Sequence, residues 1–236
     1  MSMRTTVLTQ ASKIPATKQI PIGYGKRAAI SKTEPLTEAL ELMGAPMPFS
    51  RNMEIYGEGE PADYLYKVVR GAVRTHKLLN DGRRQIGGFY LPGDVFGLEV
   101  DGEHQLTAEA VCDATIIVIK RSFVEALATR QNEVARELWA MTARELAHVQ
   151  NLMLTLGRKT AQERVAAFLL EMAARSRNAD AVELQMSRQD IADYLGLTIE
   201  TVSRTLTLLE NASAIELSSS RRIVLRNRAA LNHLNS

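Results

Sequence analysis

Apolar residues recur at two different spacings along the chain, and the change of spacing divides it into parts. Between Phe49 and Val118, short apolar or alternating runs are separated by turn-forming residues. Asn80-Asp81-Gly82 lies between two such runs and is a strong hairpin signal, and Pro92-Gly93-Asp94 marks another turn. Short strands at a spacing of roughly ten residues predict a closed antiparallel barrel or jelly roll, here of about eight strands.

Helical periodicity dominates the segments on either side. Residues 35–43 and 120–127 predict short helices. From Gln131 the chain has no Gly or Pro until Gly157, which predicts one helix of about 26 residues, roughly 39 Å long. Its apolar stripe fits packing on the barrel or contact with the same helix of a second copy. We favour the dimer, because helices that read DNA grooves usually act in pairs. The predicted dimer contacts are Leu138, Met141, Thr142, Glu145, Leu146, Val149, Leu152, Met153 and Leu156.

The segment from Ser187 to Leu209 predicts two short helices joined by a tight turn. Ser187 and Thr198 are N-cap candidates for the two helices, and Gly196 lies where the first must end. Upstream, Gly157 to Lys159 predicts a hinge, followed by a helix capped by Thr160 and Glu163. Downstream, 216–217 and 222–225 predict a small hairpin. A helix-turn-helix followed by a hairpin is a winged helix, whose second short helix enters the DNA major groove.

Charged and polar residues on that second helix suggest base recognition. Glu200 and Arg204 are four residues apart and share a face. One interpretation is an ordinary surface ion pair. The other, which the helix-turn-helix pattern favours, is that Glu200 contacts cytosine N4 and Arg204 contacts guanine O6 and N7. The candidate base-reading residues are Ile199, Glu200, Thr201, Ser203 and Arg204. The candidate phosphate contacts are Ser187, Arg188, Gln189, Thr198, Arg221 and Arg222.

Composition narrows the class of protein. The 236 residues suffice for two modest domains, and 45% hydrophobic with 24% charged residues is ordinary soluble composition. The net charge of +2 means that any basic surface is local. A single Cys excludes a disulfide within the chain, and neither a signal peptide nor a transmembrane run is evident, so we expect a cytoplasmic protein. The basic N-terminal residues are expected to be a flexible tail or an arm that adds phosphate contacts.

Four stretches resemble one family. They are GLTIETVSR (196–204), TAQERVAAFLL (160–170), GEGEPADYLYKVVRGAVR (57–74) and LPGDVFG (91–97). Together they are similar to the CRP/FNR family of bacterial transcription regulators, over about Phe49 to Leu231. The arrangement of Glu200, Ser203 and Arg204 resembles the FNR branch and, within it, the FixK-type regulators of rhizobia.

This resemblance implies an α+β fold with three parts. They are an N-terminal double-stranded β-helix (a cyclic-nucleotide-binding-like jelly roll), a long dimerisation helix and a C-terminal winged helix-turn-helix. The expected boundaries are 1–34 for the tail, 35–130 for the barrel, 131–157 for the dimerisation helix and 158–236 for the DNA-binding domain. The resemblance further implies a homodimeric activator that binds double-stranded DNA at a TTGAT–N4–ATCAA-like palindrome and contacts RNA polymerase. Control of low-oxygen and nitrogen-fixation genes is also expected.

The sequence departs from the family pattern at the positions where other members bind the ligand or cofactor that controls their activity. Family members that bind cyclic nucleotides grip the phosphate with an Arg-Ser pair, but here those positions fall near His104 and Gln105. The chain lacks the cysteines of an iron–sulfur sensor; Cys112 alone is expected to be a small buried strand residue. We therefore expect no cyclic nucleotide, no metal, no cofactor and no effector. The alternative is a regulator gated by an unidentified ligand in the barrel.

Two further classes of protein are alternatives to a DNA-binding regulator: an enzyme and a cyclic-nucleotide-type binding module. A cupin enzyme needs several His and a carboxylate inside its barrel, but only His76 and His104 lie in the predicted barrel, and neither belongs to an H-x-H pair. No nucleophile motif or phosphate-cradling Gly loop appears, so we do not expect an enzyme. A cyclic-nucleotide-type binding module with a secondary DNA role is the other alternative.

Overall fold

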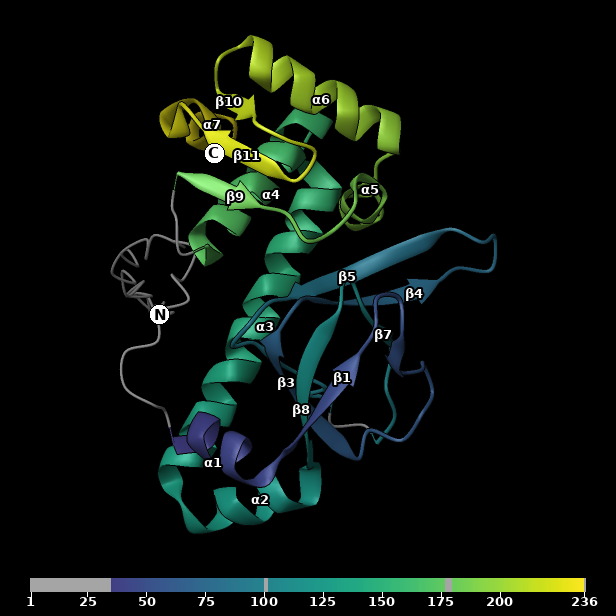
Figure 1. The fold of residues 1–236 in the computed structure, drawn as a ribbon, viewed down its shortest axis with the longest axis vertical. Coiled ribbons are helices and arrows are strands. Elements are labelled where there is room, and N and C mark those ends of the chain that lie inside the picture. Colours follow the sequence, from purple (N-terminus) through teal and green to yellow (C-terminus); the bar gives the residue numbers. More distant parts are fainter. Residues whose placement is uncertain (1–34, 100–101, 177–179, 236) are drawn as a thin grey trace, which may run out of the picture.

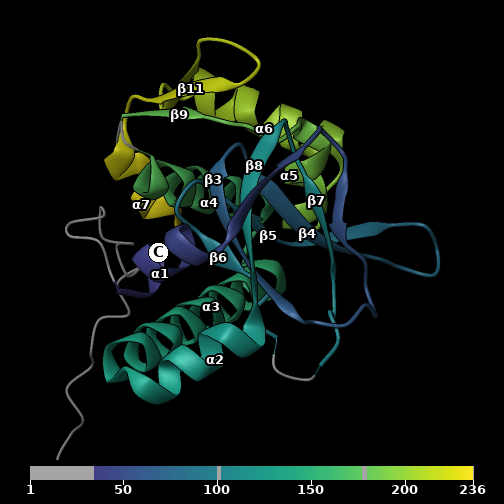
Figure 2. The ribbon, with the colours of Figure 1, turned by 60° about the horizontal axis from the view of Figure 1, so that its bottom comes forward.

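Two four-stranded antiparallel sheets form the N-terminal part of the computed structural model, which describes residues 35–99, 102–176 and 180–235 (Figures 1 and 2). The expected tail, 1–34, lies outside the described residues. The sheets have the orders β1-β8-β3-β6 and β2-β7-β4-β5. The strands are β1 (Ala45–Phe49), β2 (Glu54–Tyr56), β3 (Tyr64–Arg70), β4 (Val73–Leu78), β5 (Arg84–Tyr90), β6 (Val95–Phe96), β7 (Thr107–Ala110) and β8 (Ala114–Lys120).

The turns of this jelly roll agree with the sequence signals. The β4–β5 hairpin turns at residues 80–82, where Gly82 has φ 82° and its N–H donates to the Leu79 carbonyl over 2.9 Å. The first strand, however, starts at Ala45 rather than Phe49. Pro46 and Pro48 hide its strand pattern, and they are tolerated because β1 is an edge strand. Cys112, predicted to be a small buried strand residue, instead lies half-buried in the bend that reverses the chain between β7 and β8.

A 27-residue helix, α3 (Asn132–Arg158), runs the length of the molecule (Figure 1). At 1.5 Å per residue it is about 40 Å long. Two shorter helices, α1 (Pro35–Met43) and α2 (Arg121–Arg130), pack at its N-terminal end (Figure 2). Leu36, Leu40, Val124 and Val134 are fully or almost fully buried there, so burial of these apolar faces holds the three helices together.

The C-terminal part is a winged helix-turn-helix, which confirms the expected fold class. Its three-stranded antiparallel sheet has the order β10-β11-β9, and α5 and α6 lie beside it (Figure 1). The elements are α4 (Ala161–Arg175), β9 (Ala181–Glu183), α5 (Arg188–Leu195), α6 (Ile199–Asn211), β10 (Ile215–Leu217), β11 (Arg222–Leu225) and α7 (Arg228–Asn235).

The junction between α3 and α4 is narrower than the expected hinge, 157–159. Helix α3 continues through Gly157 to Arg158, so only Lys159 and Thr160 separate it from α4. The Arg164 guanidinium donates to the carbonyls of Leu156 (2.8 Å), Lys159 (2.9 Å) and Leu195 (2.8 Å). It therefore satisfies C-terminal carbonyls of α3 and α5 at once and fixes the direction of the helix-turn-helix relative to the long helix.

Candidate nucleic-acid interface

Helix α5 is stabilised at both ends by the residues that the sequence indicated. The Asp190 N–H donates to Ser187 Oγ over 3.1 Å, and the Ser187 N–H donates to the Asp190 carboxylate over 3.0 Å. This reciprocal pair is a capping box. At the other end Gly196 has φ 61° in the left-handed region, where glycine has no Cβ penalty. The sharp turn that follows sets the start of α6.

Helix α6 buries one face and presents the opposite one. Val202, Leu206 and Leu209 are almost completely buried, whereas the side chains of Glu200, Ser203 and Arg204 are exposed. The outward face thus carries the three residues predicted to read bases, together with Thr207, which the sequence reasoning missed.

The flanking candidates, Ile199 and Thr201, lie at the edge of this face. Ile199 is 37% exposed. Thr201 is half-buried, and its backbone N–H donates to the capping hydroxyl of Thr198 over 3.2 Å. Thr198 is therefore an N-cap, as predicted: the residue is exposed, and its hydroxyl accepts from the helix backbone.

Glu200 is an ionised acceptor. Its own backbone N–H is the main cause that lowers the pKa of its carboxyl below the ordinary value, and the Thr198 hydroxyl and the Arg204 charge lower it further. An ionised carboxylate only accepts hydrogen bonds, whereas a guanidinium only donates. Besides the hydroxyls of Ser203 and Thr207, the exposed face of α6 therefore offers one charged acceptor and one charged donor, which match cytosine N4 and guanine O6 and N7.

The candidate phosphate contacts differ in accessibility. Arg221 and Arg222 are exposed at the tip of the β10–β11 wing, where both backbone N–H groups donate to Ser219 Oγ. At the start of α5, Gln189 donates to Asp193 over 2.6 Å. Arg188 is half-buried, and burial lowers its pKa. Ser187 uses its hydroxyl for capping, so α5 would approach phosphate mainly through its N-terminal backbone.

Ion pairs that the sequence did not predict attach α5 to the barrel. Arg84 of β5 donates to Asp190 (2.7 Å) and to Asp193 (2.8 Å). Arg74 of β4 donates to the same Asp190 carboxylate over 3.0 Å and to Glu109 over 2.6 Å. The side chains of Arg74 and Asp190 are only 8% and 6% exposed, so little water competes for these bonds. The capping residue of α5 is therefore also its anchor on the jelly roll.

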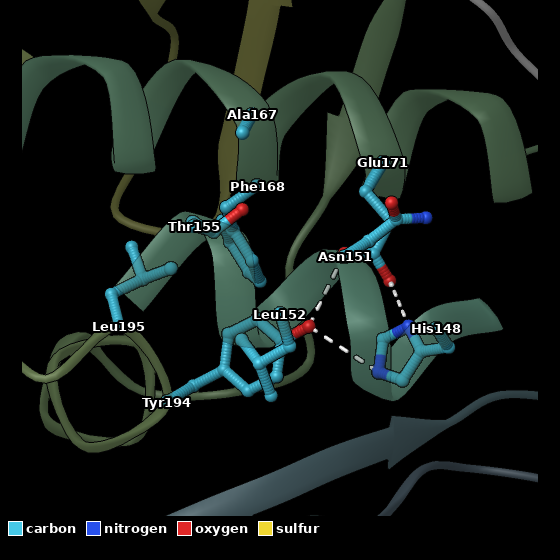
Figure 3. Close-up of a pocket in the computed structure, with 9 residues that line it drawn as sticks. All are labelled: His148, Asn151, Leu152, Thr155, Ala167, Phe168, Glu171, Tyr194 and Leu195. Carbon is cyan, nitrogen blue, oxygen red and sulfur yellow. Dashed lines mark hydrogen bonds and ion pairs between the residues drawn. The ribbon is translucent and has the colours of Figure 1, made fainter. Parts of the chain in front are cut away.

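A second polar cluster lies between α3, α4 and α5. The Tyr194 hydroxyl is 3.4 Å from His148 Nε2 and 3.3 Å from the Glu171 carboxylate, which is also paired with His148 Nδ1 at 3.7 Å (Figure 3). Arg175 extends it to the barrel by donating to Asp94 and to the Phe89 carbonyl. Burial alone would lower the pKa of Arg175, but Asp94 and Glu171 outweigh it and raise that pKa.

The predicted dimer residues of α3 separate into two groups. Met141, Glu145 and Leu152 are half-buried against the rest of the same chain, as are Leu138 and Leu156. Leu146 (58%), Val149 (50%) and Met153 (64%) are exposed, in line with exposed Thr142 and with Trp139, which is 76% exposed and was missed by the periodicity. The exposed group forms an apolar stripe that nothing in the described part of the chain covers.

The barrel interior is crowded with aromatic rings where a ligand would be sought. His104 is 1% exposed and stacks on Tyr56, with ring centroids 3.5 Å apart. Arg121, the cation beside this region, is already committed to the carbonyls of Ala62 and Gly97. Within 35–99, 102–176 and 180–235, no three His, Cys, Asp or Glu side chains lie close enough to hold a metal ion.

Comparison with known proteins identifies the family. Residues 46–131 match the cyclic nucleotide-binding domain, and residues 163–234 match the Crp-like helix-turn-helix domain. The chain is 51% identical over 204 residues to the nitrogen fixation regulation protein FixK of Azorhizobium caulinodans, covering 84% of this chain and 82% of that protein. This chain belongs to the CRP/FNR family.

Within the CRP/FNR family the similarity is to FixK proteins. The FixK protein of Rhizobium meliloti is 41% identical over 214 residues, with 87% of this chain and 98% of that protein covered. The structure of FixK2 from Bradyrhizobium japonicum superposes with a TM-score of 0.80 at 55% identity, covering 82% and 98% of the two chains. The chain is thus a FixK-type transcription regulator with a DNA-binding helix-turn-helix, and the expectation that it is not an enzyme is confirmed. No helix in the described ranges is long and apolar enough to cross a membrane.

Proposed function

We propose that this chain is a transcription activator that binds a TTGAT–N4–ATCAA-like palindrome as a homodimer, without a small-molecule effector. Its targets are genes used at low oxygen and for nitrogen fixation, and it contacts RNA polymerase to activate them. The observation that carries the proposal is the outward face of α6, where Glu200, Ser203 and Arg204 are exposed on a helix buried on its other side. The FixK names of the relatives and the activator names of others support the physiological part.

The apolar stripe of α3 supports the homodimer. Exposed apolar patches on soluble proteins usually mark interfaces, and two α3 helices paired along this stripe would place two α6 helices about a twofold axis. We expect Val149→Glu to sediment as a monomer and to lose palindrome binding. Leu154→Glu is the matched control: Leu154 is also exposed (55%), but it lies about 140° around the helix from Val149. A dimeric Val149→Glu protein would contradict this interface.

Effector independence is supported by how the two parts are joined. The ion pairs of Arg74 and Arg84 with α5 hold the helix-turn-helix on the barrel through this chain's own side chains. No ligand is needed to bridge the two. The residues described between Phe96 and Thr107 include no arginine to grip a cyclic phosphate.

Selection of bound sequences from a random DNA pool tests the whole proposal. The protein is purified free of effector and metal, and selection is run at physiological salt. Enrichment of a TTGAT-type palindrome is the expected result. Enrichment of a single half-site contradicts the dimer, and no enrichment contradicts effector independence.

The second candidate, a regulator gated by a barrel ligand, is favoured by one observation. The Tyr56 hydroxyl, one Glu99 carboxylate oxygen and both ring nitrogens of His104 are buried without a hydrogen-bond partner among the described residues. His104 Nδ1 and Glu99 Oε2 lie 3.5 Å apart. Each such group costs about 1–3 kcal/mol, which a small polar ligand would relieve. Palindrome binding that appears only after a low-molecular-weight cell extract is added would favour this candidate.

A further inference from the structure

A cavity of about 350 Å³ lies where the barrel, the long helix and the C-terminal helices meet. Its wall combines Phe89 of β5, Arg144 and Asn151 of α3, Leu170 of α4 and Asn232 of α7. Small-molecule sites favour such junctions between domains, and their volumes start at about 300 Å³. The cavity therefore has the size and the place of a ligand site, and its lining includes none of the barrel residues Tyr56, Glu99 and His104.

The lining separates into groups with and without partners. Both carboxylates are engaged: Glu145 accepts from the Tyr90 hydroxyl over 3.0 Å, and Glu171 accepts from Tyr194 and is paired with His148 and Arg175. Figure 3 is a close-up of an adjoining pocket that shares His148, Asn151 and Glu171 with this cavity, and it shows His148 and Glu171 pointing toward each other. These acids are not positioned to neutralise a further cation.

Three polar side chains on the wall remain unpartnered. Among the described residues, none forms a hydrogen bond or ion pair with the side chains of Arg144, Asn151 or Asn232. Beside them lie the buried ring of Phe89 and the half-buried side chain of Leu170. A guanidinium with two carboxamides suits an anionic head group, and the apolar wall suits a hydrocarbon body. We propose that this cavity binds a small organic anion with an apolar body.

The proposed dimer leaves this site open. Arg144 lies about 140° around α3 from Val149 and the apolar stripe, and Asn151 about 160°, so a partner helix on the stripe does not cover them. Because the wall belongs to both the barrel and the C-terminal helices, an occupant stabilises the arrangement in which they are docked. Ligand binding should therefore raise the temperature of thermal unfolding.

Titration of the full-length, metal-free protein with the fluorescent anion anilinonaphthalene sulfonate tests the site. We expect one binding site per chain. Arg144→Glu should weaken binding about tenfold or more, as expected for loss of a charge-assisted hydrogen bond. Ala174→Trp, which fills the cavity from exposed Ala174 of α4, should abolish binding. Arg136→Glu is the matched control, because it makes the same charge change on α3 outside the cavity.

Competition defines the ligand class. Hexanoate should displace the probe, and 1-hexanol, an unbranched molecule with the same number of carbon atoms and no charge, should not. Equal probe affinity in the parent and in both cavity variants, or equal displacement by the alcohol, would overturn the proposal. No step uses DNA, so a failure here leaves the proposed function intact, and a failure of DNA selection leaves this result intact.

Discussion

Arg84→Ala should weaken the attachment of α5 to the barrel without touching the predicted DNA-binding face. Two interactions are removed. Arg84 Nη2 donates to Asp190 Oδ1 over 2.7 Å, and Arg84 Nε donates to Asp193 Oδ2 over 2.8 Å. The side chains of Asp190 and Asp193 are 6% and 12% exposed, and that of Arg84 is 22% exposed. These bonds are thus mostly shielded from water.

The loss in the free energy of unfolding depends on which partners Asp190 and Asp193 keep after Arg84 is removed. Asp190 keeps Arg74 and Ser187 as partners, and Asp193 keeps Gln189, so neither carboxylate is left unpaired. The loss is therefore below the about 3–5 kcal/mol of a broken buried pair. Two hydrogen bonds to charged groups, each worth about 1.5–3 kcal/mol and reduced by partial exposure, give about 2–3 kcal/mol in the free energy of unfolding.

Urea unfolding measures this loss, with Arg83→Ala as the control. Arg83 is the adjacent residue in the chain, but among the described residues its side chain pairs with Asp81 alone, at the exposed hairpin tip, so its removal should leave the unfolding free energy unchanged. A double-mutant cycle of Arg84→Ala with Asp193→Asn should give a coupling energy of about 1 kcal/mol or more. Equal losses for Arg84→Ala and Arg83→Ala, or no coupling, would refute the reasoning.

Three further outcomes are expected. Arg204→Ala should cost about 1–3 kcal/mol of discrimination at one guanine, measured with base-substituted duplexes; an equal loss on every sequence would instead indicate a phosphate contact. Arg221→Ala should weaken binding to all sequences and reduce the slope of log affinity against log salt by about one, and an unchanged slope contradicts that role. Burial alone would raise the pKa of Asp190, but Ser187 and the two barrel arginines lower it below its ordinary value of 3.8. Its stabilisation is therefore complete above that value and lost as the pH falls through the lower folded pKa, so Asp190→Asn should flatten the acid limb of the stability curve.

Features that depend on neighbouring residues were predictable from the sequence. The capping box of Ser187 and Asp190, the left-handed Gly196 and the hairpin turn at 80–82 each involve groups within a few positions of one another. Their geometry follows from the residue types alone. The buried face of α6 followed from helical spacing for the same reason.

Features that depend on distant contacts were not predictable. Arg74 and Asp190 are 116 positions apart, and Arg84 and Asp193 are 109 apart. No local pattern relates such pairs. The stripe of α3 shows a related difficulty: periodicity places Met141 and Val149 near one face, but it does not state what each faces. The structure buries Met141 partly against its own chain and leaves Val149 exposed.

Asp190 and Arg164 together would determine the distance between the two α6 helices of the proposed dimer. Asp190 caps α5 and binds the barrel arginines, while Arg164 joins the C-terminal carbonyls of α3 and α5. In a dimer about α3, these contacts set the position of α6 relative to the twofold axis, and recognition of a palindrome depends on the distance between the two half-sites. Under this proposal the outward residues of α6 determine base preference, whereas Asp190 and Arg164 determine the half-site spacing. Loss of the Arg164 contacts should broaden the tolerated spacing and leave the preferred bases unchanged, because the Arg164 guanidinium bonds to backbone carbonyls of residues 156, 159, 195 and 196 and not to the outward side chains of α6.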